Sequence, residues 1–168
     1  QIDYDLFKNE MRRTIMKIID ETKYSIVFVP HIFKDIQAFL ELLQGINDFY
    51  IRSRIKIAPY LQGDYGSNIL FSIYQNAYSI LGMRFHANVC SIAMNKSIAG
   101  LAALDRVLNM YSSLDRDEDV VLANSCFSDA AFCKLVSPIS VNNRSLVERK
   151  IQTMNIYTRF LKETNALS

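Results

Sequence analysis

Two histidines and one arginine are the residues of this chain best suited to chemistry. His31 and His86 are the only histidines among the 168 residues, and each follows an apolar stretch that predicts a buried strand. Arg84 and Phe85 directly precede His86 in the segment GMRFHANV. An imidazole can exchange a proton near neutral pH, and a guanidinium can donate a forked pair of hydrogen bonds to a carboxylate or phosphate. The pattern therefore predicts a site for an anionic ligand.

Each of these residues also has a structural interpretation. A single histidine is more often structural than catalytic, although two of two at strand ends favour a site. Arg84 could instead form an ion pair, for which Asp35, Asp64 and Asp105 are the candidates. Phe85 is expected to anchor the turn in the core, and its backbone N–H could contact a ligand lying along the turn.

Strand and helix patterns alternate along the chain around these residues. Apolar runs predict strands at 25–29, 54–58, 79–83, 97–101 and 120–123. Apolar residues at helical spacing predict helices at 3–22, 35–49, 68–75, 87–94, 102–112, 128–135 and 142–165. We expect a glycine-containing loop at 60–66 and a solvated acidic turn at 115–119. Alternation of this kind implies parallel strands joined by helical crossovers, an α/β fold with a Rossmann-like parallel sheet flanked by helices.

The position of the candidate residues just after predicted strands bears on function. In a parallel sheet all carboxyl ends lie at one edge, where the following helices begin and where ligands bind. Backbone N–H groups and the dipole at a helix N-terminus attract anions there. His31 and the turn Arg84–His86 are both expected at this edge.

Composition and motifs argue against several classes of protein. A net charge of +2 without a basic stripe does not indicate nucleic-acid binding. No apolar run approaches the ~20 residues of a membrane span, and no signal peptide is visible, so we expect a cytoplasmic protein. The three cysteines, Cys90, Cys126 and Cys133, are expected as reduced, buried thiols. Two histidines without metal-ligand spacing predict no metal site, and phosphate-loop, dinucleotide-binding and hydrolase motifs are absent from the sequence.

Three segments carry a family resemblance. GMRFHANV, after a strand and at the start of a helix, resembles the Arg-aliphatic/aromatic-His signature of polysaccharide pyruvyl transferases. IVFVPHIFKD resembles an earlier segment of that family, a buried strand closed by Pro-His with an acidic residue soon after. The preceding IDYDLFKNEMRRTIMKII helix also fits. The resemblance covers roughly Ile2 to Leu101.

The resemblance implies an architecture and a reaction. Family members have two Rossmann-like halves facing each other across a cleft, similar to GT-B glycosyltransferases. Residues 1–168 are then expected to form a single domain, the C-terminal half of a longer protein whose N-terminal domain is missing here. The reaction transfers a pyruvyl group from phosphoenolpyruvate to a sugar as a ketal, with no cofactor and no metal required. The acceptor could be a membrane-associated glycan precursor, a homo-oligomer is compatible with the sequence, and the isolated half is expected to be inactive.

The resemblance also assigns roles to individual residues. Arg84 would bind the phosphoenolpyruvate carboxylate or phosphate, and Phe85 would contribute through its backbone. His86 would act as the adjacent donor or acid/base group, and His31 would line the cleft from the neighbouring strand end.

Two departures from the family pattern stand out. Many relatives carry a lysine after the strand that is predicted here at 97–101, where this chain has Asp105 and Arg106. The family's second half also begins with a strand before its first helix, so we expect an unfilled position in the sheet or one filled by a second chain. Two alternatives stay open: the nucleotide-sugar half of a GT-B glycosyltransferase or sugar epimerase, and a non-catalytic docking domain.

Overall fold

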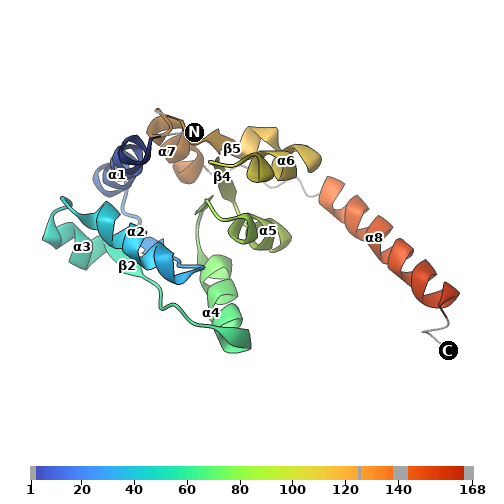
Figure 1. Cartoon of the computed structure of the whole chain (residues 1–168). Coiled ribbons are helices and arrows are strands. Elements are labelled where there is room, and N and C mark those ends of the chain that lie inside the picture. Colours follow the sequence, from blue (N-terminus) through green and yellow to red (C-terminus); the bar gives the residue numbers. More distant parts are fainter. Residues whose placement is uncertain (1–2, 125, 138–143, 165–168) are drawn as a thin grey trace.

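The computed structural model describes residues 3–124, 126–137 and 144–164, and it has an α/β fold (Figure 1). Its first part contains α1 (Tyr4–Glu21), β1 (Ile26–Phe28), α2 (Phe33–Leu43), α3 (Asp48–Arg54), β2 (Ile55–Ile57), α4 (Gly63–Asn76) and β3 (Ile80–Gly82). Its second part contains α5 (Phe85–Ala93), β4 (Ile98–Ala102), α6 (Asp105–Ser113), the 3₁₀ turn η1 (Asp117–Asp119), β5 (Val120–Leu122), α7 (Ser128–Val136) and α8 (Arg144–Glu163). The predicted alternation of strands and helices is confirmed.

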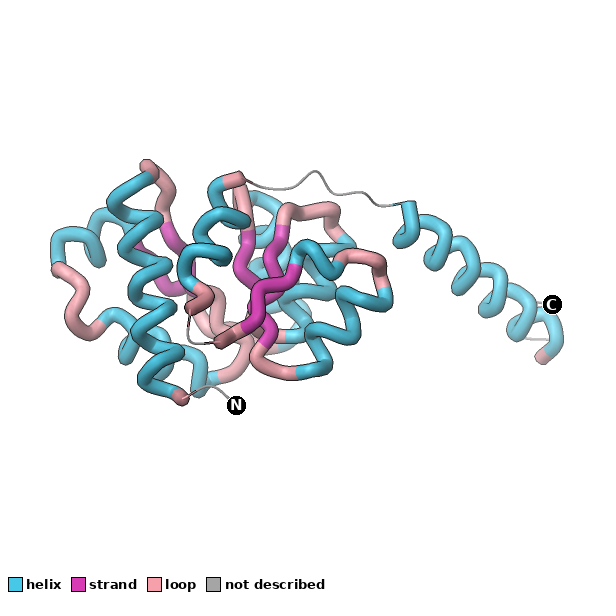
Figure 2. The backbone as a smooth tube through the Cα atoms, turned by 90° about the horizontal axis from the view of Figure 1, so that it is seen from above, coloured by secondary structure: helices cyan, strands magenta, loops and turns pink. Residues whose placement is uncertain are grey.

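All strand pairs are parallel, and they form two groups (Figure 2). β1 pairs with β2, with Ile26 opposite Ile55. β4 lies between β3 and β5, with Ile80 opposite Ile98 and Gly100 opposite Val120. In the described chain no ladder joins β1 to β3. The rings of Tyr24 and Tyr78, just before these two strands, nevertheless lie 4.9 Å apart, so the amino ends of β1 and β3 are neighbours.

Helices cover both faces of the sheet, because the apolar side chains of its strands point alternately to one face and the other. Ile98 and Ala102 of β4 pack against α5 and α6 together with Tyr74 of α4. Leu101 of the same strand faces the opposite way and packs with Met11 of α1 and residues of α7. Successive side chains of a strand point to opposite faces, so this short, fully buried strand is the middle layer of a three-layer fold.

Helix α1 connects the two groups of strands. Asp3 caps its N-terminus by accepting from the backbone of residues 5 and 6. Met11 packs with the β4–β5 core, whereas Ile15 and Ile19 pack with the core of β1 and β2. Glu10 accepts a 2.9 Å hydrogen bond from the backbone of Ser128, which joins α1 to α7. One amphipathic helix thus seals the junction between the two strand groups.

Three element boundaries differ from the sequence prediction. The single helix expected at 35–49 is two helices, α2 and α3, because Gly45 adopts a left-handed φ of 86° between them. The expected loop at 60–66 is shorter, since α4 already begins at Gly63, whose φ is 73°. α6 begins at Asp105 rather than residue 102, because β4 extends to Ala102.

The prediction of a solvated acidic turn is confirmed for Asp115, Asp117 and Glu118, which are exposed, but it is wrong for Arg116 and Asp119. Asp119 is buried and forms a 2.6 Å ion pair with Arg116, whose side chain is also buried. The ion pair with a residue three positions earlier offsets the cost of burying this carboxylate. Because both partners lie in one run of charged residues, the sequence did not reveal the pair.

The cysteine prediction was right only about the free thiols. All three are free, but Cys126 and Cys133 are exposed and Cys90 is partly buried. Cys133 lies on the outer side of α7, because the helix buries Ser128 and Ala131 instead.

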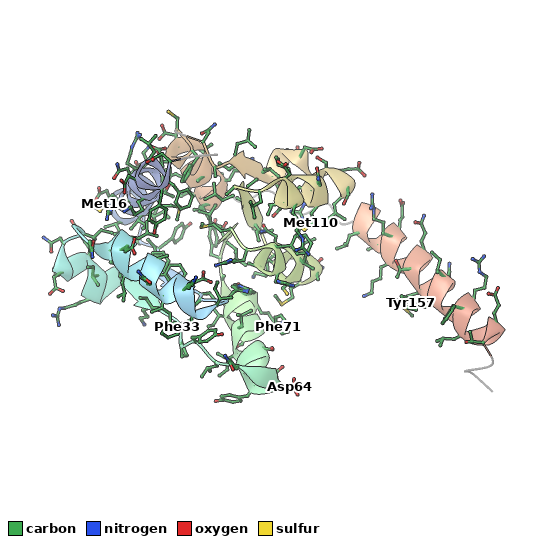
Figure 3. The ribbon with its side chains drawn as sticks, viewed as in Figure 1. Met16, Phe33, Asp64, Phe71, Met110 and Tyr157 are labelled. Atoms are coloured by element: carbon green, nitrogen blue, oxygen red, sulfur yellow. The ribbon has the colours of Figure 1, made fainter. Side chains whose placement is uncertain are left out.

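Helix α8 extends away from the rest of the fold (Figure 1). Its apolar side chains, including Tyr157, are largely exposed (Figure 3). Part of the helix predicted at 142–165 lies outside the described residues, and the described part is helical from Arg144 to Glu163.

Candidate functional site

Arg84 occupies the N-cap position of α5, two residues beyond the end of β3. Its guanidinium donates to the carboxylate of Asp35, at the start of α2, in an ion pair that links the ends of β1 and β3. Asp35 is therefore the partner among the three carboxylates considered from the sequence. The Arg84 side chain is still 48% exposed, so part of its guanidinium remains open to a ligand.

Asp35 holds both turns together. Its carboxylate also accepts hydrogen bonds from the backbone N–H groups of His31, at 2.9 Å, and Ile32, at 3.1 Å. Burial alone would raise the pKa of Asp35, but the hydrogen bond from Arg84 and the two backbone hydrogen bonds outweigh burial and lower it. The carboxylate is therefore ionised at neutral pH, and it neutralises part of the Arg84 charge while fixing that side chain in place.

His31 follows β1 and is partly buried. Its Nε2 forms a hydrogen bond with the hydroxyl of Tyr74, which reaches the site from the last turn of α4. Burial lowers the pKa of His31; Asp35 opposes this shift, whereas the positive charges of Arg84 and His86 add to it. The imidazole is therefore neutral at pH 7.

The side chains after Arg84 form an exposed ledge at the start of α5. The Phe85 ring lies edge-on to the exposed imidazole of His86, with centroids 5.9 Å apart. The guanidinium of Arg106, in the first turn of α6, lies 3.9 Å from the Phe85 ring centre. A cation at this distance over an aromatic face is a favourable contact. Phe85 is thus partly buried and supports a second arginine, beyond the core role expected from sequence.

Asn88 fixes the backbone beneath this ledge. It is fully buried, and its amide donates to the carbonyls of Gly82, at 3.0 Å, and Arg84, at 2.8 Å. Its own oxygen accepts from the Tyr111 hydroxyl at 2.8 Å. A Cβ atom at Gly82 would lie 2.4 Å from the Asn88 oxygen, so this position requires glycine. The hydrogen bonds of Asn88 therefore hold the turn that presents Arg84 in one conformation.

The structure brings most of the predicted site residues to one place. Asp35 connects the Arg84 side chain to the backbone of His31, and His86 is close enough to shift the pKa of His31. Sequence reasoning missed Tyr74 and Asn88. A buried asparagine within an apolar helical segment was the available signal for Asn88, whereas nothing in the local pattern around Tyr74 distinguishes it from an ordinary core residue.

Neither metal-ligand groups nor the small cavity found in the described part of the chain indicate a different site. We find no group of three or more metal-ligating side chains there. A cavity of about 10 Å³ lies at the amino end of β4, lined in part by Ser97, Arg116 and Lys134. Its volume suits about one water molecule, so it is too small for a substrate. Across the described segments, no helix has the length and apolar character needed to cross a membrane.

These features define a class: an α/β domain with a fixed arginine and two histidines at the carboxyl edge of parallel strands, suited to an anion. The family model for polysaccharide pyruvyl transferase matches residues 1–103, which contain both strand-end turns. The chain belongs to the polysaccharide pyruvyl transferase family, and the resemblance stated from its motifs is confirmed. No curated protein and no solved structure shows a significant match.

Proposed function

We propose that this chain is the half of a pyruvyl transferase that binds phosphoenolpyruvate. The observation that carries the proposal is Arg84, a half-exposed arginine at the start of α5, held by Asp35 and placed beside His86. Phosphoenolpyruvate carries a carboxylate and a phosphate close together, which suits a forked donor at a helix N-terminus. The Phe85 N–H and the stacked Arg106 supply further donors at the same edge.

The transfer itself needs one proton and one leaving group. A proton adds to the methylene carbon of phosphoenolpyruvate, and a sugar hydroxyl oxygen bonds to the central carbon. The bond from that carbon to the phosphate oxygen breaks, a second hydroxyl closes the ketal, and the hydroxyl protons leave to the phosphate or a base. In this scheme Arg84 holds the anion, His86 moves the proton, and His31 donates a hydrogen bond.

The partners follow from this assignment. The acceptor is a sugar of a polysaccharide or glycan precursor, and a facing Rossmann-like half, as in GT-B enzymes, completes its site. We place the enzyme in the cytoplasm, where phosphoenolpyruvate is available, acting on a soluble or membrane-associated glycan. Residues 1–168 then form one domain that binds the donor but does not turn over by itself.

Calorimetric titration of the chain with phosphoenolpyruvate tests the proposal. We expect saturable binding that Arg84→Ala weakens about 30-fold or more, since a charge-assisted contact contributes about 2–3 kcal/mol. Arg52→Ala is the matched control, because Arg52 also forms an ion pair, with Asp48, but lies on α3. Equal binding by wild type and Arg84→Ala would contradict the assignment.

Two further titrations address the alternatives. Binding of a nucleotide sugar in place of phosphoenolpyruvate would favour a GT-B glycosyltransferase or an epimerase half. Binding of neither ligand, by a folded protein, would favour a docking domain. The half-exposed Arg84 side chain supports the ligand-binding assignment, because a docking domain would leave this arginine fully paired and inaccessible.

A further inference from the structure

Tyr74 joins the core of the fold to the candidate site. Its side chain is only 4% exposed and packs with Ile80 of β3 and Ala87 of α5. Its hydroxyl nevertheless reaches the end of β1, where it meets Nε2 of His31. The two rings are stacked, with centroids 6.1 Å apart and an interplanar angle of 24°. The contact is therefore fixed at both ends, by core packing on the tyrosine side and by the β1 turn on the histidine side.

In this hydrogen bond the Tyr74 hydroxyl is the donor and His31 Nε2 is the acceptor, because the buried hydroxyl must donate its proton. A buried phenol has one proton to donate, and leaving that proton without an acceptor is costly. Burial raises the pKa of Tyr74, so the group stays a phenol throughout the physiological range. Among the described residues, His31 Nε2 is the acceptor we find for it. Nε2 must then be free of hydrogen, and in a neutral imidazole the hydrogen is on Nδ1.

The surroundings of His31 keep the ring neutral. Burial and the charges of Arg84 and His86 lower the pKa of His31. Asp35 is the one neighbour that opposes them, but its carboxylate is already engaged by Arg84 and two backbone N–H groups. A doubly protonated ring would also set an Nε2 hydrogen against the Tyr74 hydroxyl hydrogen.

We propose that Tyr74 is a positioning residue that fixes His31 in the Nδ1–H tautomer, so that His31 serves the site as a neutral hydrogen-bond donor. We find no partner for Nδ1 in the described part of the chain, and His31 stands at the same edge as the half-exposed Arg84. The ligand group that matches a neutral N–H beside a guanidinium is an anionic oxygen, of a carboxylate or a phosphate. That the oxygen belongs to phosphoenolpyruvate rests on the proposed function, whereas the tautomer does not.

This assignment separates the roles of the two histidines. His31 has its Nε2 occupied by Tyr74 and can only donate through Nδ1. His86 is exposed, and its ring is roughly perpendicular to that of Phe85, so its imidazole is open to solvent and can exchange a proton with a ligand. Proton transfer therefore falls to His86, and hydrogen-bond donation to His31.

Long-range ¹H–¹⁵N NMR of the labelled chain tests the tautomer directly, because the two ring nitrogens of a neutral histidine have distinct shifts. With only two histidines in the chain, His31→Gln assigns the signals. We expect the Nδ1–H pattern for His31 at pH 7. Tyr74→Phe should convert it to a mixture of tautomers and raise the pKa of His31, since the bond to the neutral ring is lost.

Tyr111→Phe is the matched control for Tyr74→Phe. Tyr111 is also buried and donates to Asn88, so its loss perturbs the core without removing a hydrogen bond of His31. An Nε2–H pattern for His31 in the wild-type spectrum would overturn the proposal, and that spectrum decides even where Tyr74→Phe does not fold. An unchanged His31 tautomer in a folded Tyr74→Phe variant would overturn it as well.

The ligand part is tested by adding phosphoenolpyruvate or inorganic phosphate to the same sample. We expect the Nδ1 signal of His31 to shift with saturation in wild type, and the shift to be lost in Arg84→Ala. Binding that leaves this signal unmoved would overturn the donor role. Absence of any binding would overturn the proposed function and leave the tautomer assignment supported by the first experiment.

Discussion

The turns after β1 and after β3 bring one histidine each to the same edge of the fold, but they are built in opposite ways. After β1 the functional side chain is fixed: His31 is bonded to Tyr74, and its backbone is bonded to Asp35. After β3 the buried Asn88 fixes the backbone, Asp35 holds the half-exposed Arg84 side chain, and the His86 side chain remains exposed.

The comparison indicates what each turn contributes. Side chains bound to the core keep one protonation state and one orientation, which suits a hydrogen-bond donor. Arg84 is held by Asp35 but half exposed, which suits an anchor for a ligand. The exposed His86 can move and exchange protons, which suits a proton carrier. Asp35 couples the two turns, because it bonds to the backbone of one and the side chain of the other.

The largest loss of stability is expected from removing the buried Asn88, which holds the turn after β3. Asn88→Ala leaves two carbonyls and the Tyr111 hydroxyl without their partner in the core, and it should cost about 3 kcal/mol of unfolding free energy. Asn76→Ala, which removes an exposed asparagine bonded to Ser72, is the matched control and should cost far less. Urea unfolding measures the free energy of unfolding of both variants. Similar losses in the two would show that Asn88 does not fix the β3 turn.

A smaller loss of stability is expected from removing Asp35, which connects the turn after β1 to the turn after β3. Asp35→Ala removes a carboxylate that accepts two backbone N–H groups near the start of α2, a loss of about 1–2 kcal/mol. It should also leave Arg84 less well positioned and weaken phosphoenolpyruvate binding. Asp48→Ala removes an exposed carboxylate from the first turn of α3 and serves as the control. Thermal unfolding and calorimetry of both variants would show whether Asp35 has any special role.

The pH dependence of stability should contain a contribution from His31. Because folding lowers the pKa of His31, the unfolded chain takes up a proton first as the pH falls below about 6.5, and the folded state loses stability. The contribution is complete above that pH and disappears as the pH falls through the folded pKa. We expect His31→Gln to flatten the dependence between pH 7 and pH 5 by less than about 1 kcal/mol. A wild-type dependence retained in His31→Gln would contradict this.

The smallest effect on stability is expected at His86. His86→Gln changes an exposed side chain, so the unfolding free energy should stay within about 0.5 kcal/mol of wild type. Phosphoenolpyruvate binding should weaken less than in Arg84→Ala, whereas turnover by a protein containing both halves should fall strongly. Chemical denaturation, calorimetry and an assay of phosphate release measure the three quantities, and a large loss of stability would place His86 in the fold rather than the site.

Much of the fold could be predicted from the sequence because apolar periodicity is a local signal. The five strands and the helices on both sides of Arg84 follow from it, and the helix predicted at 87–94 ends within one residue of α5, which ends at Ala93. The break between α2 and α3 could not be predicted with the same ease, since Gly45 interrupts an apolar pattern that continues across it. The ion pair that buries Asp119 was hidden for a related reason, because its partner lies within the same run of charges.

The sequence by itself determined which residues could bind an anion and that they follow strands. His31, Arg84, Phe85 and His86 were all named from residue type and position, and the family was named from their motifs. Only the tertiary structure decided how they are connected: that Asp35 pairs with Arg84, that Tyr74 bonds to His31, and that Asn88 holds the β3 turn. The physical reason is separation along the chain, since Asp35 lies 49 residues from Arg84 and Tyr74 lies 43 residues from His31. Contacts of that kind leave no periodic trace in sequence, because they depend on how parallel strands align their carboxyl ends.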